Sequence, residues 1–233
     1  MKVNILLLTI DRYHLTADFV GEALSNAGYP FELCCTDNGS KDMQVIELVK
    51  SWNPKLHILN SYNKGTAQSL NEMIRQAPAD AYVFIGNDIR MPKDWLKKLV
   101  EAAQAVEDSG VIGIDWRGLT YDKEVVNGVT IQNTTNVFGT MFVTQKTRNK
   151  VGEFCEDYGV YGLWDSDYSI RCRIAGLRNF YIDKLKTEHM GSDVGENTEY
   201  RKMKDKSLQA AQPIFNANHE EYKKGNYIKK YAQ

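Results

Sequence analysis

The first 90 residues alternate between short apolar runs and longer segments in which apolar residues recur at helical spacing. A strand buried on both faces is continuously apolar, whereas a helix packed on a sheet shows one apolar stripe, so the runs predict strands and the segments predict helices. Strands are predicted at 3–8, 31–36, 56–59 and 82–85, and helices at 15–27, 42–51 and 67–76. Because strands joined through helices run parallel, this half predicts an α/β fold with a mostly parallel sheet flanked by helices.

The second half of the chain is less regular. Helices are predicted at 93–106 and 163–175, a short helix or turn at 146–151, and strands at 110–114 and 179–182. Residues 125–132 and 137–143 are strand-like around the turn residues Asn127-Gly128. No internal repeat and no low-complexity linker interrupts the chain, so a separate second domain is not expected.

Polar residues follow directly after each of the four strands predicted in the first half, at 9–13, 37–40, 63–66 and 86–88. The carboxyl ends of parallel strands meet at one edge of a sheet, where open α/β sheets bind ligands. Taken alone, each segment is typical of a turn or a helix cap. Their convergence, with the acids Asp37 and Asp88 at two of the strand ends, favours a binding site for a nucleotide with its metal.

The order of these loops resembles the family 2 glycosyltransferases of the GT-A type. Three segments are similar to the opening motifs of that family, namely Thr9-Ile10-Asp11-Arg12-Tyr13, Asp37-Asn38-Gly39-Ser40-Lys41-Asp42, and Asn63-Lys64-Gly65 with Asn71. Gly86-Asn87-Asp88 stands where the family has Asp-x-Asp or Asn-Asn-Asp, so Gly86 replaces the first acid. The resemblance implies a UDP-, GDP- or TDP-sugar donor, with Asp37 on the base or ribose, and the donor-binding residues Thr9, Arg12, Asp37, Asn63, Gly65 and Asn87.

The resemblance continues to residue 192. Phe138 to Val143 and Val151-Gly152-Glu153-Phe154 are similar to the next conserved segments of the family, and residues 164–171 resemble its Glu-Asp-x-Asp-Leu-x-x-Arg segment, with Trp164 in place of the first acid. His189-Met190-Gly191-Ser192 is similar to a late His-x-Gly-Ser element that reaches the metal. The implied organisation is a GT-A domain over 1–195, divided into a nucleotide-sugar-binding half (1–110) and an acceptor half (111–195), and a basic helical extension over 196–233.

The predicted metal ligands are Asp88 and His189. A leaving diphosphate is stabilised by a divalent cation, and Mg²⁺ or Mn²⁺ in such sites is held by one or two protein groups together with phosphates and water. A nitrogen ligand favours Mn²⁺ over Mg²⁺. Two alternatives stay open: His189 is an ordinary surface or hydrogen-bonded histidine, or the loss of an acid at Gly86 weakens the site.

Asp165 is the predicted general base, which would deprotonate the acceptor hydroxyl as it attacks the anomeric carbon opposite the diphosphate and so invert the configuration. Trp164 and Asp167 are assigned to the acceptor site. The alternatives are that Trp164 belongs to the core, that Asp167 pairs with Arg171 four residues later on the same helix face, and that both acids cap the helix.

The chain carries a net charge of −1, but residues 200–233 hold eight Lys or Arg against three acids. Such a basic tail is a solvated helix face or a contact to an anionic membrane, polymer or nucleic acid. The predicted acceptors are glycans, lipid-linked acceptors and polymers, with nucleic acid as a further alternative. No apolar run approaches the roughly 18 residues of a spanning helix, and no signal peptide precedes residue 3. The four cysteines form no CxxC motif. These features predict a cytoplasmic protein, with contact to the inner face of the membrane as an alternative.

Two other classes of protein fit the same residues. A non-catalytic binder of sugars or nucleotides could have lost its metal affinity through Gly86. A nucleotidyltransferase could use a similar sheet, but such enzymes usually begin with a Gly-rich loop that carries Arg and Lys, and residues 9–13 contain no Gly.

Overall fold

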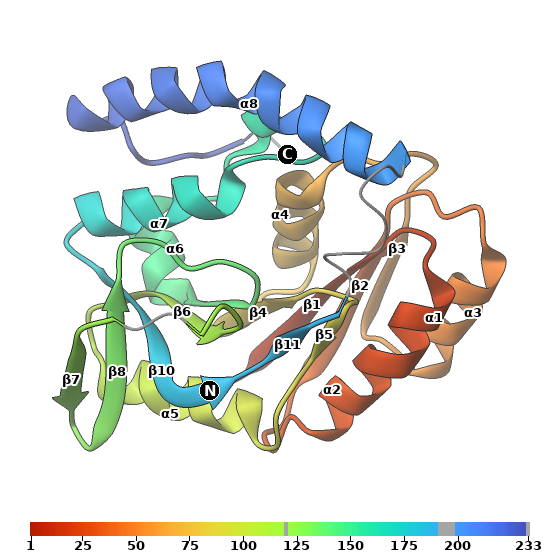
Figure 1. The fold of residues 1–233 in the computed structure, drawn as a ribbon, viewed down its shortest axis with the longest axis horizontal. Coiled ribbons are helices and arrows are strands. Elements are labelled where there is room, and N and C mark those ends of the chain that lie inside the picture. Colours follow the sequence, from red (N-terminus) through yellow and green to blue (C-terminus); the bar gives the residue numbers. More distant parts are fainter. Residues whose placement is uncertain (119–120, 191–198, 232–233) are drawn as a thin grey trace.

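The computed structural model describes residues 1–118, 121–190 and 199–231, in which a nine-stranded sheet lies between two layers of helices (Figure 1). The strand order is β3-β2-β1-β4-β9-β6-β10-β8-β7. The strands are β1 (Val3–Thr9), β2 (Glu32–Asp37), β3 (Leu56–Leu59), β4 (Ala81–Ile85), β6 (Ser109–Asp115), β7 (Lys123–Val126), β8 (Val129–Thr134), β9 (Met141–Thr144) and β10 (Arg178–Lys186).

The first half of the chain forms the parallel part of the sheet. Strand β1 pairs in parallel with β2 and β4, and β2 pairs in parallel with β3, so the predicted strands and their direction are confirmed. The connections are made by helices α1 (Tyr13–Leu15), η1 (Thr16–Val20), α2 (Gly21–Ser25), α3 (Met43–Ser51) and α4 (Thr66–Gln76). The predicted helix at 15–27 therefore exists, although its first part is a π-helical turn.

The second half extends this sheet with strands of both directions. Strand β9 runs antiparallel between β4 and β6, whereas β10 is parallel to β6. The predicted strand at 125–132 is a hairpin of β7 and β8, because Asn127 and Gly128 both have positive φ and form its two-residue turn. Further helices are α5 (Trp95–Ala105), α6 (Gln145–Val151), η2 (Glu156–Tyr158), α7 (Trp164–Ile174) and α8 (Glu199–Lys223).

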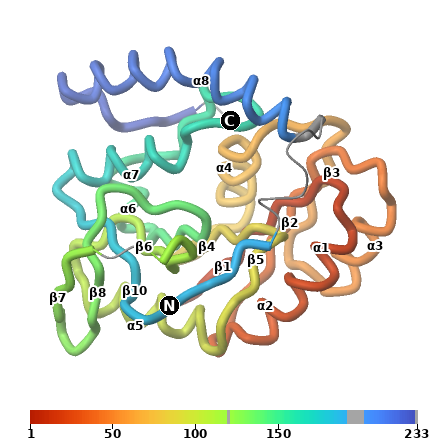
Figure 2. The backbone as a smooth tube through the Cα atoms, in the orientation of Figure 1, coloured from red at the N-terminus to blue at the C-terminus, as the bar shows by residue number. Residues whose placement is uncertain are grey.

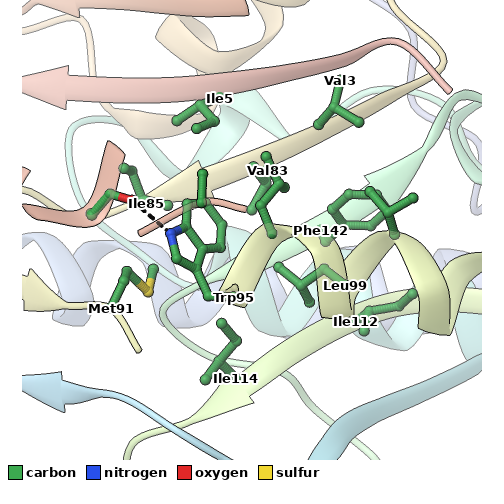
Figure 3. Packing of buried hydrophobic residues seen from close by; sticks show 14 of the residues in the cluster. Val3, Ile5, Val83, Ile85, Met91, Trp95, Leu99, Ile112, Ile114 and Phe142 are labelled. Atoms are coloured by element: carbon green, nitrogen blue, oxygen red, sulfur yellow. Dashed lines mark hydrogen bonds between the residues drawn. The ribbon is translucent and has the colours of Figure 1, made fainter. Parts of the chain in front are cut away.

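One face of the sheet packs against α2, α3 and α5. Trp95 is fully buried at the centre of this core, and its indole nitrogen donates a hydrogen bond to the backbone carbonyl of Ala23 at 2.7 Å. Figure 3 shows its ring among aliphatic side chains of several strands, including Ile5, Val83 and Ile114. The hydrogen bond satisfies the one polar atom of the ring, so this tryptophan joins α2 to α5 without an unpaired donor.

The other face packs against α4, α6 and α7, and α8 lies on the outer side of this layer, in contact with α7 and η2 (Figures 1 and 2). Helix α8 is attached through Ala211, which is 1% exposed, and the chain after it returns to the domain at Lys229. The backbone of Lys229 pairs with Val151 and Glu153 beside α6. Residues 199–231 are therefore packed on the domain, while the predicted boundary at 195 and 196 lies outside the described residues. No helix in the described part of the chain is both long and apolar enough to cross a membrane.

A buried polar network joins α7 to α8. Asp167 and Arg171 form an ion pair at 2.7 Å with both side chains fully buried. The hydroxyls of Tyr158 and Tyr222 both donate to Asp167, and Arg171 also donates to the carbonyls of Val151 and Glu153. The partners satisfy both charges, as burial of an ion pair requires. The alternative in which Asp167 pairs with Arg171 is therefore confirmed.

Replacing Tyr222 by Phe is expected to lower the free energy of unfolding by about 1.5–3 kcal/mol, because it removes a buried hydrogen bond to a charged carboxylate. Urea denaturation measures this difference. Tyr227→Phe is the matched control, since the hydroxyl of Tyr227 makes no hydrogen bond with the described residues. Equal losses in the two variants would contradict a role for the Tyr222 hydroxyl.

Candidate active site

A pocket opens at the carboxyl ends of β1 and β4, with a volume of about 210 Å³. Each of the four polar loops predicted from the sequence contributes to its wall. The residues from these loops are Thr9, Ile10, Arg12, Asn38, Asn63, Thr66, Gly86, Asn87 and Asp88. The wall is completed by residues from the second half, which include Gly139, Val160, Tyr161, His189, Met203 and Lys204. The structure therefore brings the four loops together at one rim, as the sequence predicts.

The loop after β1 is held in an uncommon backbone conformation. Asp11 and Arg12 both have positive φ, at 47° and 60°. The Asp11 carboxylate accepts hydrogen bonds from the backbone of Lys41 and Asp42, at 2.7 and 3.0 Å, and its own backbone N–H donates to the Ser40 hydroxyl. These bonds offset the strain and join two of the rim loops. The result is that the Arg12 guanidinium reaches Asp88, with 3.5 Å between Nη1 and Oδ2.

Asp37 stabilises the second loop from within. Its carboxylate accepts from the Thr9 hydroxyl at 2.8 Å, from the Ser40 hydroxyl, and from the backbone N–H groups of Gly39 and Ser40 at 3.1 and 2.8 Å. The side chain is 2% exposed and does not line the pocket, whereas its neighbour Asn38 does. The contact of Asp37 to a base or ribose stays a prediction, and it would require one of these donors to be replaced.

The third loop makes a tight turn that glycine alone fits. The Asn63 side chain accepts from the backbone N–H of Gly65 at 2.9 Å, and Gly65 has a φ of 90°. A Cβ atom on Gly65 would lie 2.3 Å from the carbonyl oxygen of Gly159. The turn therefore packs directly against the backbone of the loop that precedes Tyr161, so Gly65 shapes the pocket by close approach.

Replacing Gly65 by Ala is expected to lower the free energy of unfolding by about 1–3 kcal/mol, because the new Cβ meets a backbone oxygen and φ is positive. Thermal unfolding measures the change. Gly128→Ala is the matched control, since Gly128 has a φ of 83° with nothing within 4 Å of the added Cβ. A loss in Gly65→Ala no larger than that in Gly128→Ala would mean that the close approach to Gly159 is unimportant.

Asp88 and His189 are brought together by a small second sheet. Strands β5 (Ile89–Arg90) and β11 (Glu188–His189) pair antiparallel, with His189 opposite Ile89, and the Asp88 carbonyl accepts from the Met190 N–H at 2.8 Å. His189 Nε2 lies 3.5 Å from Asp88 Oδ1. In octahedral coordination at about 2.1 Å, neighbouring ligand atoms are about 3 Å apart, so a separation of 3.5 Å is compatible with both atoms binding one cation.

Asp88 and His189 are the candidate ligands that the described residues place at that point. No group of three or more His, Cys, Asp or Glu suited to a metal occurs among the residues that the structure describes. Two protein ligands fit the chemistry of Mg²⁺ or Mn²⁺ bound together with substrate phosphates, in which oxygens of the ligand and water fill the other positions. The predicted Gly191 and Ser192 of the same motif lie outside the described residues.

Asp165 lies at the start of α7. Its Oδ1 accepts from the backbone N–H of Ser166 at 2.7 Å. Burial raises the pKa of Asp165 to about 6, and this is partly offset by backbone hydrogen bonds and by the positive charge of Arg117. Burial also raises the pKa of Tyr161, with further contributions from the charges of Asp165 and Asp88. Tyr161, which lines the pocket, is thus within electrostatic reach of both carboxylates.

The predicted roles of Trp164 and Asp167 in binding the acceptor are wrong. Trp164 is 7% exposed, and its ring packs edge-on against Phe84 and Phe154 with centroids 5.5 Å apart in both cases. Asp167 is fully buried in its ion pair. Helix α7 is covered by the sheet on one side and by α6 and α8 on others, so these side chains belong to the core.

Several residues of the site were missed from the sequence. Tyr161, Met203 and Lys204 line the pocket, and the ring of Trp116 packs against that of His189 in a tilted arrangement with ring centroids 5.2 Å apart. Arg117 lies over Phe138 at 4.1 Å. Tyr161 and Trp116 come from irregular loops that carry no periodic signal. The basic composition of residues 200–233 was the one signal that pointed towards Lys204.

Residues 5–158 match the family model of Glycosyl transferase family 2. Because the match covers more than half of the chain, the protein belongs to glycosyl transferase family 2, and the family predicted from the motifs is confirmed.

Individual relatives are similar over parts of their length. The uncharacterized glycosyltransferase YfnE of Bacillus subtilis (strain 168) is 29% identical over 89 residues, which are 37% of this chain and 23% of YfnE. The mannosyltransferase PcManGT from Pyrobaculum calidifontis, solved with GDP-Man and Mn²⁺, matches with a TM-score of 0.66 and 16% identity over 83% of this chain and 58% of its own. S. aureus TarS 1–349, solved with UDP-GlcNAc, matches with a TM-score of 0.61 and 15% identity over 91% of this chain and 72% of its own.

The structural matches confirm the predicted fold class, a mixed α/β fold of the GT-A type with a mostly parallel central sheet. At 16% and 15% identity they show the fold alone. The chain spans less than two thirds of both YfnE and PcManGT, at 23% and 58% of their lengths.

Proposed function

We propose that this protein transfers a sugar from a nucleoside-diphosphate sugar to an acceptor hydroxyl, with inversion at the anomeric carbon. The observation that carries the proposal is the meeting of Asp88 and His189, 3.5 Å apart, on the wall of a pocket formed by the strand-end loops. Membership of a glycosyltransferase family supports it. So do the complexes of related folds, since PcManGT was solved with GDP-Man and TarS with UDP-GlcNAc.

The donor would occupy this pocket. Thr9, Asn63 and Asn87 line it. The Thr9 hydroxyl is held by Asp37, and Asn87 is oriented by a hydrogen bond of 3.0 Å from its amide to the Thr16 hydroxyl. Arg12 brings a positive charge beside Asp88. Pockets for nucleotides combine such fixed polar groups with apolar walls, here including Phe84 and Val160.

Asp88 and His189 would hold a divalent cation together with the diphosphate of the donor. A bound cation supplies Lewis-acid stabilisation of the charge that develops on the departing diphosphate. The neighbouring Arg12 adds a second positive charge on the same side. PcManGT was solved with Mn²⁺, and a histidine ligand favours Mn²⁺ over Mg²⁺, so Mn²⁺ is the proposed ion.

Asp165 would act as the general base. With a pKa of about 6 it is mostly ionised at pH 7, yet more basic than an ordinary aspartate, which suits removal of a proton from a hydroxyl. Arg117 stabilises the ionised form from a distance. The acceptor hydroxyl would be held between Asp165 and the anomeric carbon of the donor, and the acceptor classes proposed are glycans, lipid-linked glycans and polymers.

The test is hydrolysis and transfer by the full chain with UDP-, GDP-, CMP- and TDP-sugars in the presence of Mn²⁺. We expect release of free nucleoside diphosphate from at least one donor, and the released sugar or product to show inverted configuration by NMR. Tight binding of a nucleotide without any turnover would favour a non-catalytic binder. Binding of no nucleotide at all would overturn the proposal.

A further inference from the structure

Helix α8 contributes two side chains to the pocket, although it lies more than a hundred residues from the strand-end loops in sequence. Met203 and Lys204 line the same pocket as Asp88 and His189. The Lys204 ammonium group lies over the ring of Tyr161, 4.6 Å from its centroid. Lys204 therefore has a defined place beside Tyr161, which is within electrostatic reach of both Asp88 and Asp165.

The position of α8 is fixed by contacts along the rest of its length. Ala211 packs against Gly162, where an added Cβ would lie 2.9 Å from that of Ala211. The Asn218 amide donates to the Tyr158 hydroxyl at 3.2 Å, and Tyr222 donates to Asp167. The same domain therefore carries both the strand-end loops and Lys204, which makes α8 a wall of the pocket.

The charge of Lys204 suits a diphosphate. A lysine is a compact point charge with three donors and is a common ligand of phosphate oxygens. Asp88 places a negative charge in the pocket, and a nucleoside diphosphate would bring several more. Binding these charges requires positive groups on more than one side of the pocket. Because Gly86 replaces an acid, the strand-end loop also has one acid fewer to bind a cation.

We propose that Lys204 binds the diphosphate of the nucleotide-sugar donor, so that helix α8 forms part of the donor site. The assignment rests on the proposed function, because it requires a nucleoside diphosphate in this pocket. It makes the basic C-terminal region a component of the site through one residue, Lys204, rather than through its overall charge.

The experiment is titration calorimetry of the full chain with UDP, GDP, CDP and TDP, each with Mn²⁺ and with EDTA, and with the matching nucleosides. Lys204→Gln is expected to weaken binding of the nucleoside diphosphate at least tenfold under both conditions while leaving nucleoside binding within about twofold, since one charge-assisted hydrogen bond is lost. Lys204→Arg should retain most of the affinity. Lys206→Gln is the matched control, because Lys206 is exposed on the same helix and its replacement removes the same charge.

The outcomes separate the two proposals. If the unmodified protein binds none of the four nucleoside diphosphates, the proposed function fails and the role of Lys204 fails with it. If it binds one of them and Lys204→Gln binds it equally well, only the assignment of Lys204 is overturned. Equal losses in Lys204→Gln and Lys206→Gln would also overturn it, because they would indicate a general effect of charge. Thermal unfolding of each variant verifies that the fold is intact.

Discussion

Replacing Asp165 by Asn is expected to lower the rate of sugar transfer by about two to four orders of magnitude, the usual contribution of a general base. The affinity for the nucleoside diphosphate should stay within about twofold, because Asp165 does not line the donor pocket. The Asn side chain has the same shape, and its oxygen can still accept the hydrogen bond from the Ser166 N–H. Steady-state kinetics together with calorimetry measure the two effects separately.

Asp18→Asn is the matched control for this substitution, since Asp18 is exposed on η1 and the change in charge is the same. Its rate should be that of the unmodified protein. If Asp165→Asn transferred sugar at an unchanged rate, Asp165 would not be the base. If it lost nucleotide affinity in parallel with rate, Asp165 would belong to the donor site instead.

The same carboxylate predicts a pH dependence. A base acts only when it is ionised, and burial raises the pKa of Asp165 to about 6. The value of kcat/KM should therefore fall as the pH is lowered through about 6 and level off above it, since this ratio reports groups of the free enzyme. The residual activity of Asp165→Asn should lack this dependence.

The parallel half of the sheet and its polar loops were accessible from the sequence because each has a local signal. Apolar runs of four to six residues mark buried strands, and the polar residues that follow them must lie at the carboxyl edge once the strands are parallel. Asp88, Asn63 and Arg12 accordingly line one pocket.

The small sheet of β5 and β11 was not accessible in this way. Each of its strands has two residues, which is too short for any periodic pattern, and they lie about one hundred positions apart in the chain. His189 was selected through the family resemblance alone. The pairing with Ile89 supplies the physical reason for its position, since it carries the imidazole to within 3.5 Å of Asp88.

The errors at Trp164 and Asp167 have a different origin. Helix α7 is covered on several sides, so its sequence has no single apolar stripe that separates core from surface. Asp167 and Arg171 neutralise each other inside, with help from tyrosines of η2 and α8. From the sequence, a polar residue on such a helix is predicted to belong to a site, because the partners that bury it lie up to 55 positions away.

Gly86 leaves space for the carboxylate of Asp88. A Cβ at this position would lie 3.0 Å from Asp88 Oδ1 and 3.1 Å from the Ile89 side chain. A larger residue would therefore crowd the one carboxylate that faces His189. The glycine leaves Asp88 room to keep its contacts to Arg12 and His189.

Replacing Asp88 by Ala is expected to abolish the effect of Mn²⁺ on binding of the nucleoside diphosphate and to lower the transfer rate at least a hundredfold. In the unmodified protein, affinity should be at least tenfold higher with Mn²⁺ than with EDTA, because the cation would join the carboxylate to the phosphates. In Asp88→Ala the two affinities should be equal, since only His189 would be left to hold the ion. Calorimetry under the two conditions gives the ratio directly.

His189→Gln should reduce the ratio without removing it, because a carboxylate is a stronger ligand than an imidazole for such hard cations. His14→Gln is the matched control for the histidine, since His14 is exposed and is not among the pocket residues. If the affinities with Mn²⁺ and with EDTA were already equal in the unmodified protein, the site would work without a metal. The fixed cations of the pocket would then have to stabilise the charge on the departing diphosphate. The loss of transfer in Asp88→Ala would have to come from the displacement of Arg12.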